Sequence, residues 1–126
     1  MTDERPLVVV ADDDEDILLL VSATLTGGGY AVQLARDGNA ALSLLRERRA
    51  AAAVLDVAMP DLDGLEVLTR VRADPTIADL PIVLLSARAQ ESDVARGYEL
   101  GASKYIRKPF SPRELVATVD QLVGRY

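Results

Sequence analysis

Short apolar segments alternate with longer segments of helical periodicity, and this cycle repeats five times along the chain. The longer segments place apolar residues three or four positions apart, as on one face of a helix. Such alternation predicts strand–helix units that share one parallel sheet. The expected strands cover residues 7–11, 30–35, 52–57, 82–86 and 104–108. The first helix is expected to begin in the acidic residues 14–16 and to stop at the glycines 27–29, and the others to cover 39–48, 65–72, 92–100 and 112–123.

Five such units predict an α/β fold with one doubly wound, five-stranded parallel sheet flanked by five helices, a flavodoxin-like topology. The common strand order for this topology is 2-1-3-4-5. One hydrophobic core is expected at this length, so residues 1–126 are predicted to form a single domain. In such sheets, ligands bind at the carboxyl ends of the strands, which meet at one edge. That edge is where chemistry is expected.

Four of the five expected strands end in residues that carry chemistry. Asp12 and Asp13 follow the first strand, and Asp56, Ser86 and Lys108 lie at the ends of the third, fourth and fifth strands. Three neighbouring carboxylates repel one another, and Mg²⁺, which prefers oxygen ligands, would join them, with Lys108 as a further positive group. We expect Asp12 and Asp13 to hold the metal. Asp56, presented singly by the central strand, is the expected nucleophile toward phosphorus, and Ser86 would hydrogen-bond the phosphoryl group.

Composition narrows the function classes. Hydrophobic residues make up 49% and charged residues 27% of the chain, as in a folded globular domain. Cysteine and histidine are absent, which excludes thiolate chemistry, imidazole bases and a phosphohistidine on this chain. The net charge of -6 disfavours direct nucleic acid binding. No apolar run is long enough for a membrane span and the start lacks a signal-peptide pattern, so a cytoplasmic location is expected.

The segments VVVADDDEDILLL, VLDVAMPDLDG, IVLLSARA and KYIRKPFSPREL resemble the response-regulator receiver domains of two-component signalling, over essentially the full chain. The resemblance implies a Mg²⁺ site formed by Asp12, Asp13 and Asp56 with the main-chain carbonyl of Ala58. It also implies that Asp56 accepts a phosphoryl group from the phosphohistidine of a sensor histidine kinase or phosphotransfer protein. Such a protein catalyses only its own phosphorylation and dephosphorylation, and is not otherwise an enzyme.

The same resemblance implies a switch. Ser86 would shift toward the phosphoryl group, Tyr105 would turn inward behind it, and Lys108 would precede a cis Pro109. Gly64 is expected to shape the loop after the phosphoacceptor. The changed surface would be that of the fourth helix, fifth strand and fifth helix, which would contact a downstream effector or output domain. For Tyr105, an ordinary core position is the alternative, since it lies inside an apolar strand.

Two positions depart from the family pattern. Ala58 is smaller than the residues often found two positions after the phosphoacceptor, which predicts easier access of water and faster loss of phosphate. Ser103 and Lys104 stand where dimerising transcription-factor receivers often carry an acidic pair. A phosphorylation-dependent homodimer stays among the expected partners, but the ion pairs that hold such dimers elsewhere are in doubt here.

Three other functions compete with this interpretation. A phosphatase of the haloacid dehalogenase-like family needs a second aspartate two residues after its nucleophile, and Ala58 occupies that position. A flavin carrier of the same topology needs aromatic residues for stacking, and these are only 4% with no tryptophan. A degenerate receiver, used as a phosphorylation-independent docking module, is the main alternative. The intact set of Asp56, Ser86 and Lys108 favours the phosphoacceptor.

Overall fold

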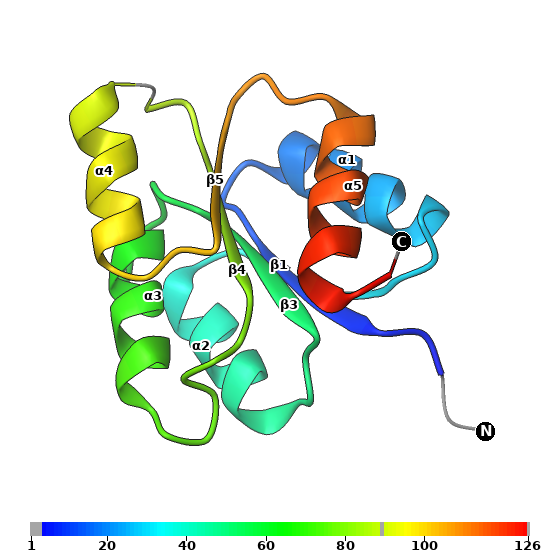
Figure 1. The fold of residues 1–126 in the computed structure, drawn as a ribbon, viewed down its shortest axis with the longest axis horizontal. Helices are drawn as coiled ribbons and strands as arrows, with labels where there is room; N and C mark the ends of the chain where they lie inside the picture. Colours follow the sequence, from blue (N-terminus) through cyan, green and yellow to red (C-terminus); the bar gives the residue numbers. More distant parts are fainter. Residues whose placement is uncertain (1–3, 89, 126) are drawn as a thin grey trace.

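The computed structural model describes residues 4–88 and 90–125 and has one five-stranded sheet between two layers of helices (Figure 1). The strand order is β2-β1-β3-β4-β5 and every neighbouring pair is parallel, which confirms the predicted topology. The elements in chain order are β1 (Leu7–Ala11), α1 (Glu15–Gly27), β2 (Ala31–Ala35), α2 (Gly38–Glu47), β3 (Ala52–Asp56), α3 (Gly64–Ala73), β4 (Ile82–Ser86), α4 (Glu91–Glu99), β5 (Lys104–Arg107) and α5 (Pro112–Val123).

The two faces of the sheet are covered by different helices. Figure 1 shows α1 and α5 on one side, and α2, α3 and α4 on the other. Successive strand residues point to opposite faces, so Val8 and Val10 join the core beneath α1 and α5, whereas Val9 and Ala11 join the opposite core. β3 and β4 are buried along their whole length, as expected of parallel strands covered on both faces. Residues that end these strands therefore stand on a rigid support.

Side chains before four of the helices fix where each helix begins. The carboxylates of Asp14, Asp37 and Asp63 accept hydrogen bonds from backbone N–H groups in the first turns of α1, α2 and α3. Ser111 Oγ accepts from the N–H of Glu114 at 3.3 Å and so caps α5. Because these caps satisfy N–H groups that have no partner within the helix, the starting points follow from local sequence.

Several predicted boundaries were wrong by one residue. Tyr30 does not start β2, because its N–H donates to the Leu25 carbonyl and so closes the end of α1. Val57 and Lys108 lie just beyond β3 and β5, although their N–H groups still donate to the carbonyls of β4. Helices α2, α3 and α4 each begin one residue before the predicted start, at Gly38, Gly64 and Glu91. At the other end, α2 and α4 stop one residue earlier than predicted, and α3 stops one residue later.

Two glycines let the starts of α2 and α3 approach the segment that follows β3. A Cβ on Gly64 would lie 2.2 Å from the backbone oxygen of Asp56, and one on Gly38 would lie 1.8 Å from the backbone oxygen of Leu62. Real side chains do not tolerate such distances, so only glycine fits without a backbone shift. The N–H of Gly64 also donates to the Val57 carbonyl at 2.9 Å. These contacts hold the carboxyl end of β3 in place.

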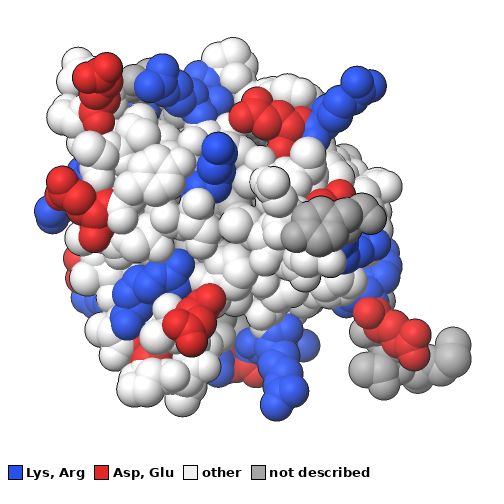
Figure 2. Space-filling model, in the orientation of Figure 1, with Lys and Arg blue, Asp and Glu red and all other residues white. Residues whose placement is uncertain are grey.

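Charged side chains of both signs are interspersed on the face shown in Figure 2, around a largely uncharged centre. Nucleic acid interfaces instead concentrate Lys and Arg in one patch or stripe. Among the described residues, this face shows no such concentration. Within residues 4–88 and 90–125, no helix combines the length and apolar character needed to cross a bilayer.

Candidate functional site

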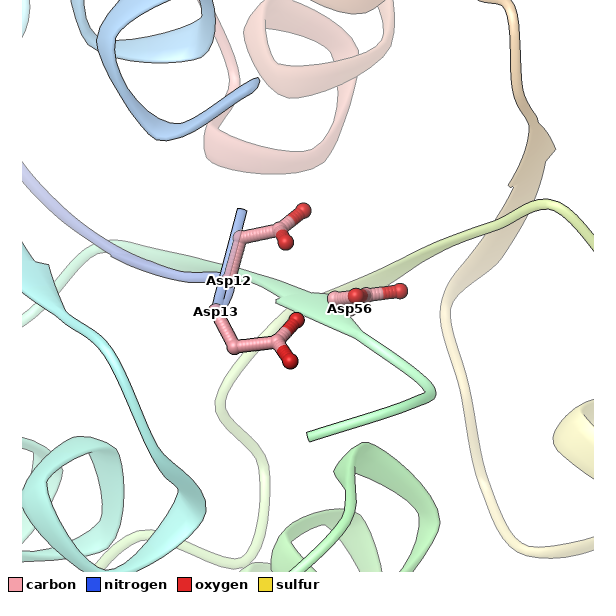
Figure 3. A group of neighbouring side chains, drawn as sticks. All are labelled: Asp12, Asp13 and Asp56. Atoms are coloured by element: carbon pink, nitrogen blue, oxygen red, sulfur yellow. The ribbon is translucent and has the colours of Figure 1, made fainter. Parts of the chain in front are cut away.

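Three carboxylates meet at the carboxyl edge of the sheet. Asp12 and Asp13 directly follow β1, and Asp56 is the last residue of β3, the neighbouring strand. Each offers an oxygen, and these oxygens all lie within 4.8 Å of one another. In Figure 3 the side chains of Asp12 and Asp13 leave the end of β1 toward the side on which Asp56 lies. Asp12 and Asp56 are buried and Asp13 is exposed, so the cluster is open to solvent on one side.

The turn from β1 into α1 orients Asp12. Its backbone N–H donates to the Ala35 carbonyl at 3.2 Å, and its Oδ1 accepts from the N–H of Asp14 at 2.9 Å. Asp14 in turn caps α1, and Glu15 pairs with Arg36 at 2.8 Å. The acidic residues that follow Asp13 thus take part in the start of the helix, as the sequence predicted, and Asp12 is held with one oxygen turned toward the cluster.

Lys108 brings one positive charge to the cluster. Its Nζ lies 3.0 Å from Asp12 Oδ2 and 3.4 Å from Asp56 Oδ1, and the peptide bond to Pro109 is cis, as predicted. Burial alone would lower the pKa of Lys108, but the hydrogen bond to Asp12 and the charges of both carboxylates outweigh it and raise that pKa. Three carboxylates and one ammonium leave two negative charges uncompensated, which suits a divalent cation.

The surroundings of Asp56 raise the pKa of its carboxyl group. Burial, followed by the negative charge of Asp12, raises the pKa of Asp56 from 3.8 to about 6, although Lys108 partly opposes the rise. The side chain is only 7% exposed. Asp56 Oδ1 accepts a hydrogen bond from the N–H of Ala58 at 3.4 Å, and Ala58 is exposed. Above neutral pH the group is mostly ionised, and it is then a carboxylate nucleophile in a largely buried, strongly charged setting.

Ser86 and Tyr105 meet at the backbone of Arg88, in the segment that follows β4. Ser86 is the last residue of β4 and is buried, and its Oγ accepts from the Arg88 N–H at 3.0 Å. Tyr105 belongs to β5 and is 7% exposed, with its ring turned inward. Its hydroxyl donates to the Arg88 carbonyl at 2.9 Å. A serine that ends one strand and a tyrosine inside the next are therefore joined through the backbone of one residue, Arg88.

Residues 8–120 match the sequence model of the response regulator receiver domain. This chain belongs to the response regulator receiver family. Response regulator MprA of Mycolicibacterium vanbaalenii is 46% identical to the receiver domain over 102 residues, which are 81% of this chain and 43% of that relative. The match thus spans less than half the length of this curated relative.

Solved receiver structures have the same fold. The receiver domain of Francisella response regulator 1452 superposes with a TM-score of 0.89 at 33% identity, covering 94% of this chain and 97% of that one. The receiver domain of a sensor histidine kinase from Pseudomonas aeruginosa PAO1, solved with a magnesium ion coordinated in its active site cleft, gives 0.88 at 28% identity, covering 95% and 98%. The predicted family is confirmed.

Several contacts of the receiver domain escaped the sequence reasoning. The hydroxyl of Tyr98 in α4 accepts the N–H of Tyr105 at 3.1 Å. The half-buried Arg72 donates to the carbonyls of Gly101, Ala78 and Leu80 at 2.7 to 3.0 Å, and so ties α3 to two loops. No local sequence motif predicts these contacts, because each joins segments that come together only when the helices pack on the sheet. The carbonyl of Ala58 stays a predicted metal ligand.

Proposed function

We propose that this receiver domain is a phosphoacceptor, in which Asp56 takes a phosphoryl group from the phosphohistidine of a sensor histidine kinase or phosphotransfer protein. The observation that carries the proposal is the buried carboxylate of Asp56, with Lys108 at 3.4 Å and two further carboxylates beside it. An ionised oxygen of Asp56 attacks phosphorus in line. A phosphorus–oxygen bond forms as the phosphorus–nitrogen bond breaks, and the donor imidazole leaves.

The donor set fits Mg²⁺, a hard cation that takes oxygen ligands and keeps several waters. The carboxylates of Asp12, Asp13 and Asp56 would hold it, together with the main-chain carbonyl of Ala58. When bound, the ion would neutralise charge on the transferring phosphoryl group. The excess of negative charge in the cluster and the magnesium ion in the similar Pseudomonas receiver structure both support this choice.

The remaining site residues would stabilise the product and pass on the signal. The ammonium of Lys108 would balance charge on the phosphoryl oxygens, and the Ser86 hydroxyl would turn from the Arg88 N–H to donate to one of them. That turn changes the segment to which the Tyr105 hydroxyl is bonded. The surface of α4, β5 and α5 would then report the change to a downstream effector or output domain, or to a second copy of this chain.

The test is to incubate the protein with Mg²⁺ and acetyl phosphate and to measure its intact mass. The wild type is expected to gain one phosphoryl group, which excess EDTA prevents and which Asp56→Asn abolishes. Asp61→Asn, a like change at an exposed carboxylate in the following loop, serves as the matched control and should gain the group normally. An Asp56→Asn variant that is labelled at the wild-type rate contradicts the assignment.

A wild type that stays unlabelled with Mg²⁺ present favours the alternative, a degenerate receiver that docks partners without phosphorylation. In either case we propose no chemistry on another molecule: the chain promotes only its own phosphorylation and dephosphorylation. The cytoplasmic location stays a prediction from the sequence.

A further inference from the structure

A continuous series of hydrogen bonds runs from the site to the surface of α4. Ser86 Oγ accepts from the Arg88 N–H at 3.0 Å, and the Arg88 carbonyl accepts from the Tyr105 hydroxyl at 2.9 Å. The N–H of Tyr105 then donates to the hydroxyl of Tyr98 at 3.1 Å. Tyr98 is 43% exposed, whereas Ser86 and Tyr105 are buried. The series therefore links a buried hydroxyl at the end of β4, the strand next to β3, to an exposed hydroxyl on a helix.

Tyr98 accepts a hydrogen bond from a backbone N–H of β5 that has no partner within the sheet. β5 lies at the edge of the sheet, so N–H groups on its outer side have no partner strand. The Tyr105 N–H is such a group, and the hydroxyl that accepts it comes from α4. The bond can form only while α4 lies at this height and rotation against β5. The hydrogen bond of Tyr98 therefore depends on the position of α4 relative to β5.

Gly97, the neighbour of Tyr98, brings α4 directly onto the ring of Tyr105. A Cβ at Gly97 would lie 2.8 Å from Cδ2 of Tyr105 and 3.0 Å from Cδ1 of Leu84. The backbone of α4 thus packs on the inward ring with no side chain between them. Tyr105 is held by α4 on its ring and at its N–H, and by Arg88 at its hydroxyl. The inward position of the Tyr105 ring and the position of α4 therefore depend on each other.

We propose that Tyr98 is a positioning residue that acts through Tyr105: its hydroxyl favours the arrangement with Tyr105 inward and α4 docked, and thereby raises affinity for a phosphoryl group at Asp56. The inference rests on the proposed function. A ligand that prefers one of two packings binds more tightly when that packing is already favoured. Removing one ordinary hydrogen bond shifts such an equilibrium by about two- to tenfold.

The experiment compares Tyr98→Phe with Tyr30→Phe. Both changes remove one tyrosine hydroxyl that makes a hydrogen bond, but Tyr30 bonds Asp120 at 2.5 Å on the α1 and α5 side of the sheet, away from Tyr105. Each variant is titrated with beryllofluoride in saturating Mg²⁺, as a stable mimic of the phosphoryl group, and followed by NMR. Before beryllofluoride is added, amide hydrogen exchange at Tyr105 and the melting temperature are measured for each protein.

For Tyr98→Phe we expect faster exchange at the Tyr105 amide and a half-saturating beryllofluoride concentration raised about two- to tenfold. Tyr30→Phe should lower the melting temperature but leave both readings at their wild-type values. A Tyr98→Phe protein with wild-type beryllofluoride affinity overturns the inference, since Tyr98 then only adds stability. Unchanged exchange at Tyr105 overturns it too. A wild type that does not bind beryllofluoride at all overturns the proposed function itself, which is a distinct result.

Discussion

Replacing Asp56 by asparagine is expected to stabilise the metal-free receiver domain above neutral pH. The Asp56 side chain is 7% exposed, the Asp12 side chain beside it is 3% exposed, and Lys108 is shared between them. Burial, followed by the charge of Asp12, raises the pKa of Asp56 from 3.8 to about 6. The folded protein therefore holds this proton more tightly than the unfolded chain does. Ionising Asp56 favours unfolding, and asparagine removes that penalty.

The sign and size of the effect follow from linkage. Well below pH 3.8, the ordinary pKa of this carboxyl group, Asp56 is protonated in both states and carries no penalty. As the pH rises toward 6, the unfolded chain loses the proton first, so stability falls, and above about pH 6 to 7 the loss is complete. The shift from 3.8 to about 6 corresponds to roughly 3 kcal/mol. The amide of asparagine needs its own partners, so we expect a net gain of about 1 to 3 kcal/mol at pH 8.

Thermal unfolding in EDTA at pH 4, 5, 6 and 8 measures this gain. For a domain of 126 residues, 1 kcal/mol corresponds to roughly 4 °C in melting temperature. Asp56→Asn should thus melt about 4 to 12 °C above the wild type at pH 8, and the difference should shrink toward pH 4. Asp61→Asn is the matched control: its carboxylate is exposed, and asparagine accepts the positive φ of 66° at that position.

The reasoning is refuted if Asp56→Asn melts no higher than the wild type at pH 8 in EDTA. It is also refuted if the gain is as large at pH 4 as at pH 8, because electrostatics would then not be its source. A comparable gain for Asp61→Asn would point to a general effect of net charge on this acidic chain.

Three further predictions concern the same edge of the sheet. Mg²⁺ should raise the melting temperature of the wild type, because binding at a hundred times the dissociation constant adds about 2.7 kcal/mol to the stability of the folded state. Asp13→Asn should weaken the dependence of the melting temperature on Mg²⁺ concentration, and equal titrations of the two proteins would contradict a role for Asp13. Gly64→Ala should lower stability in urea by about 1 to 3 kcal/mol, since its Cβ would lie 2.2 Å from the Asp56 backbone oxygen, whereas Gly27→Ala, with nothing within 4 Å, should be neutral or stabilising. Ala58→Met should prolong the life of the acyl phosphate, timed by intact mass after donor removal, because a larger side chain hinders water; an unchanged lifetime would refute this.

Within the site, the sequence was informative wherever a residue's place depends on its own strand. Asp56 could be assigned to the end of the third strand because the apolar run before it is continuous, and parallel strands end at one edge. The meeting of Asp56 with Asp12 and Asp13 followed from strand order alone, and the structure places their oxygens within 4.8 Å. The approach of Lys108 was predicted in the same way, but its shorter distance to Asp12 than to Asp56 was not.

Contacts between helices and strands were out of reach of the sequence. The bond from the Tyr105 N–H to the Tyr98 hydroxyl joins residues seven positions apart, and its formation depends on how far α4 slides along β5. The same holds for the close approach of Gly38, the first residue of α2, to Leu62 in the loop between β3 and α3. Apolar periodicity states which face of a helix is buried, but leaves its height and rotation on the sheet open.

The sequence by itself determined the five strand–helix units, their order in the sheet and the set of polar residues at the carboxyl edge. The units and the polar residues follow from local periodicity, and the order is the common one for five units with right-handed crossovers. Only the tertiary structure decided that Asp56 is buried enough for its pKa to rise, and that Tyr105 lies inward under α4. Both depend on how side chains from distant segments exclude water and share hydrogen bonds, and those energies exist only once the chain is folded.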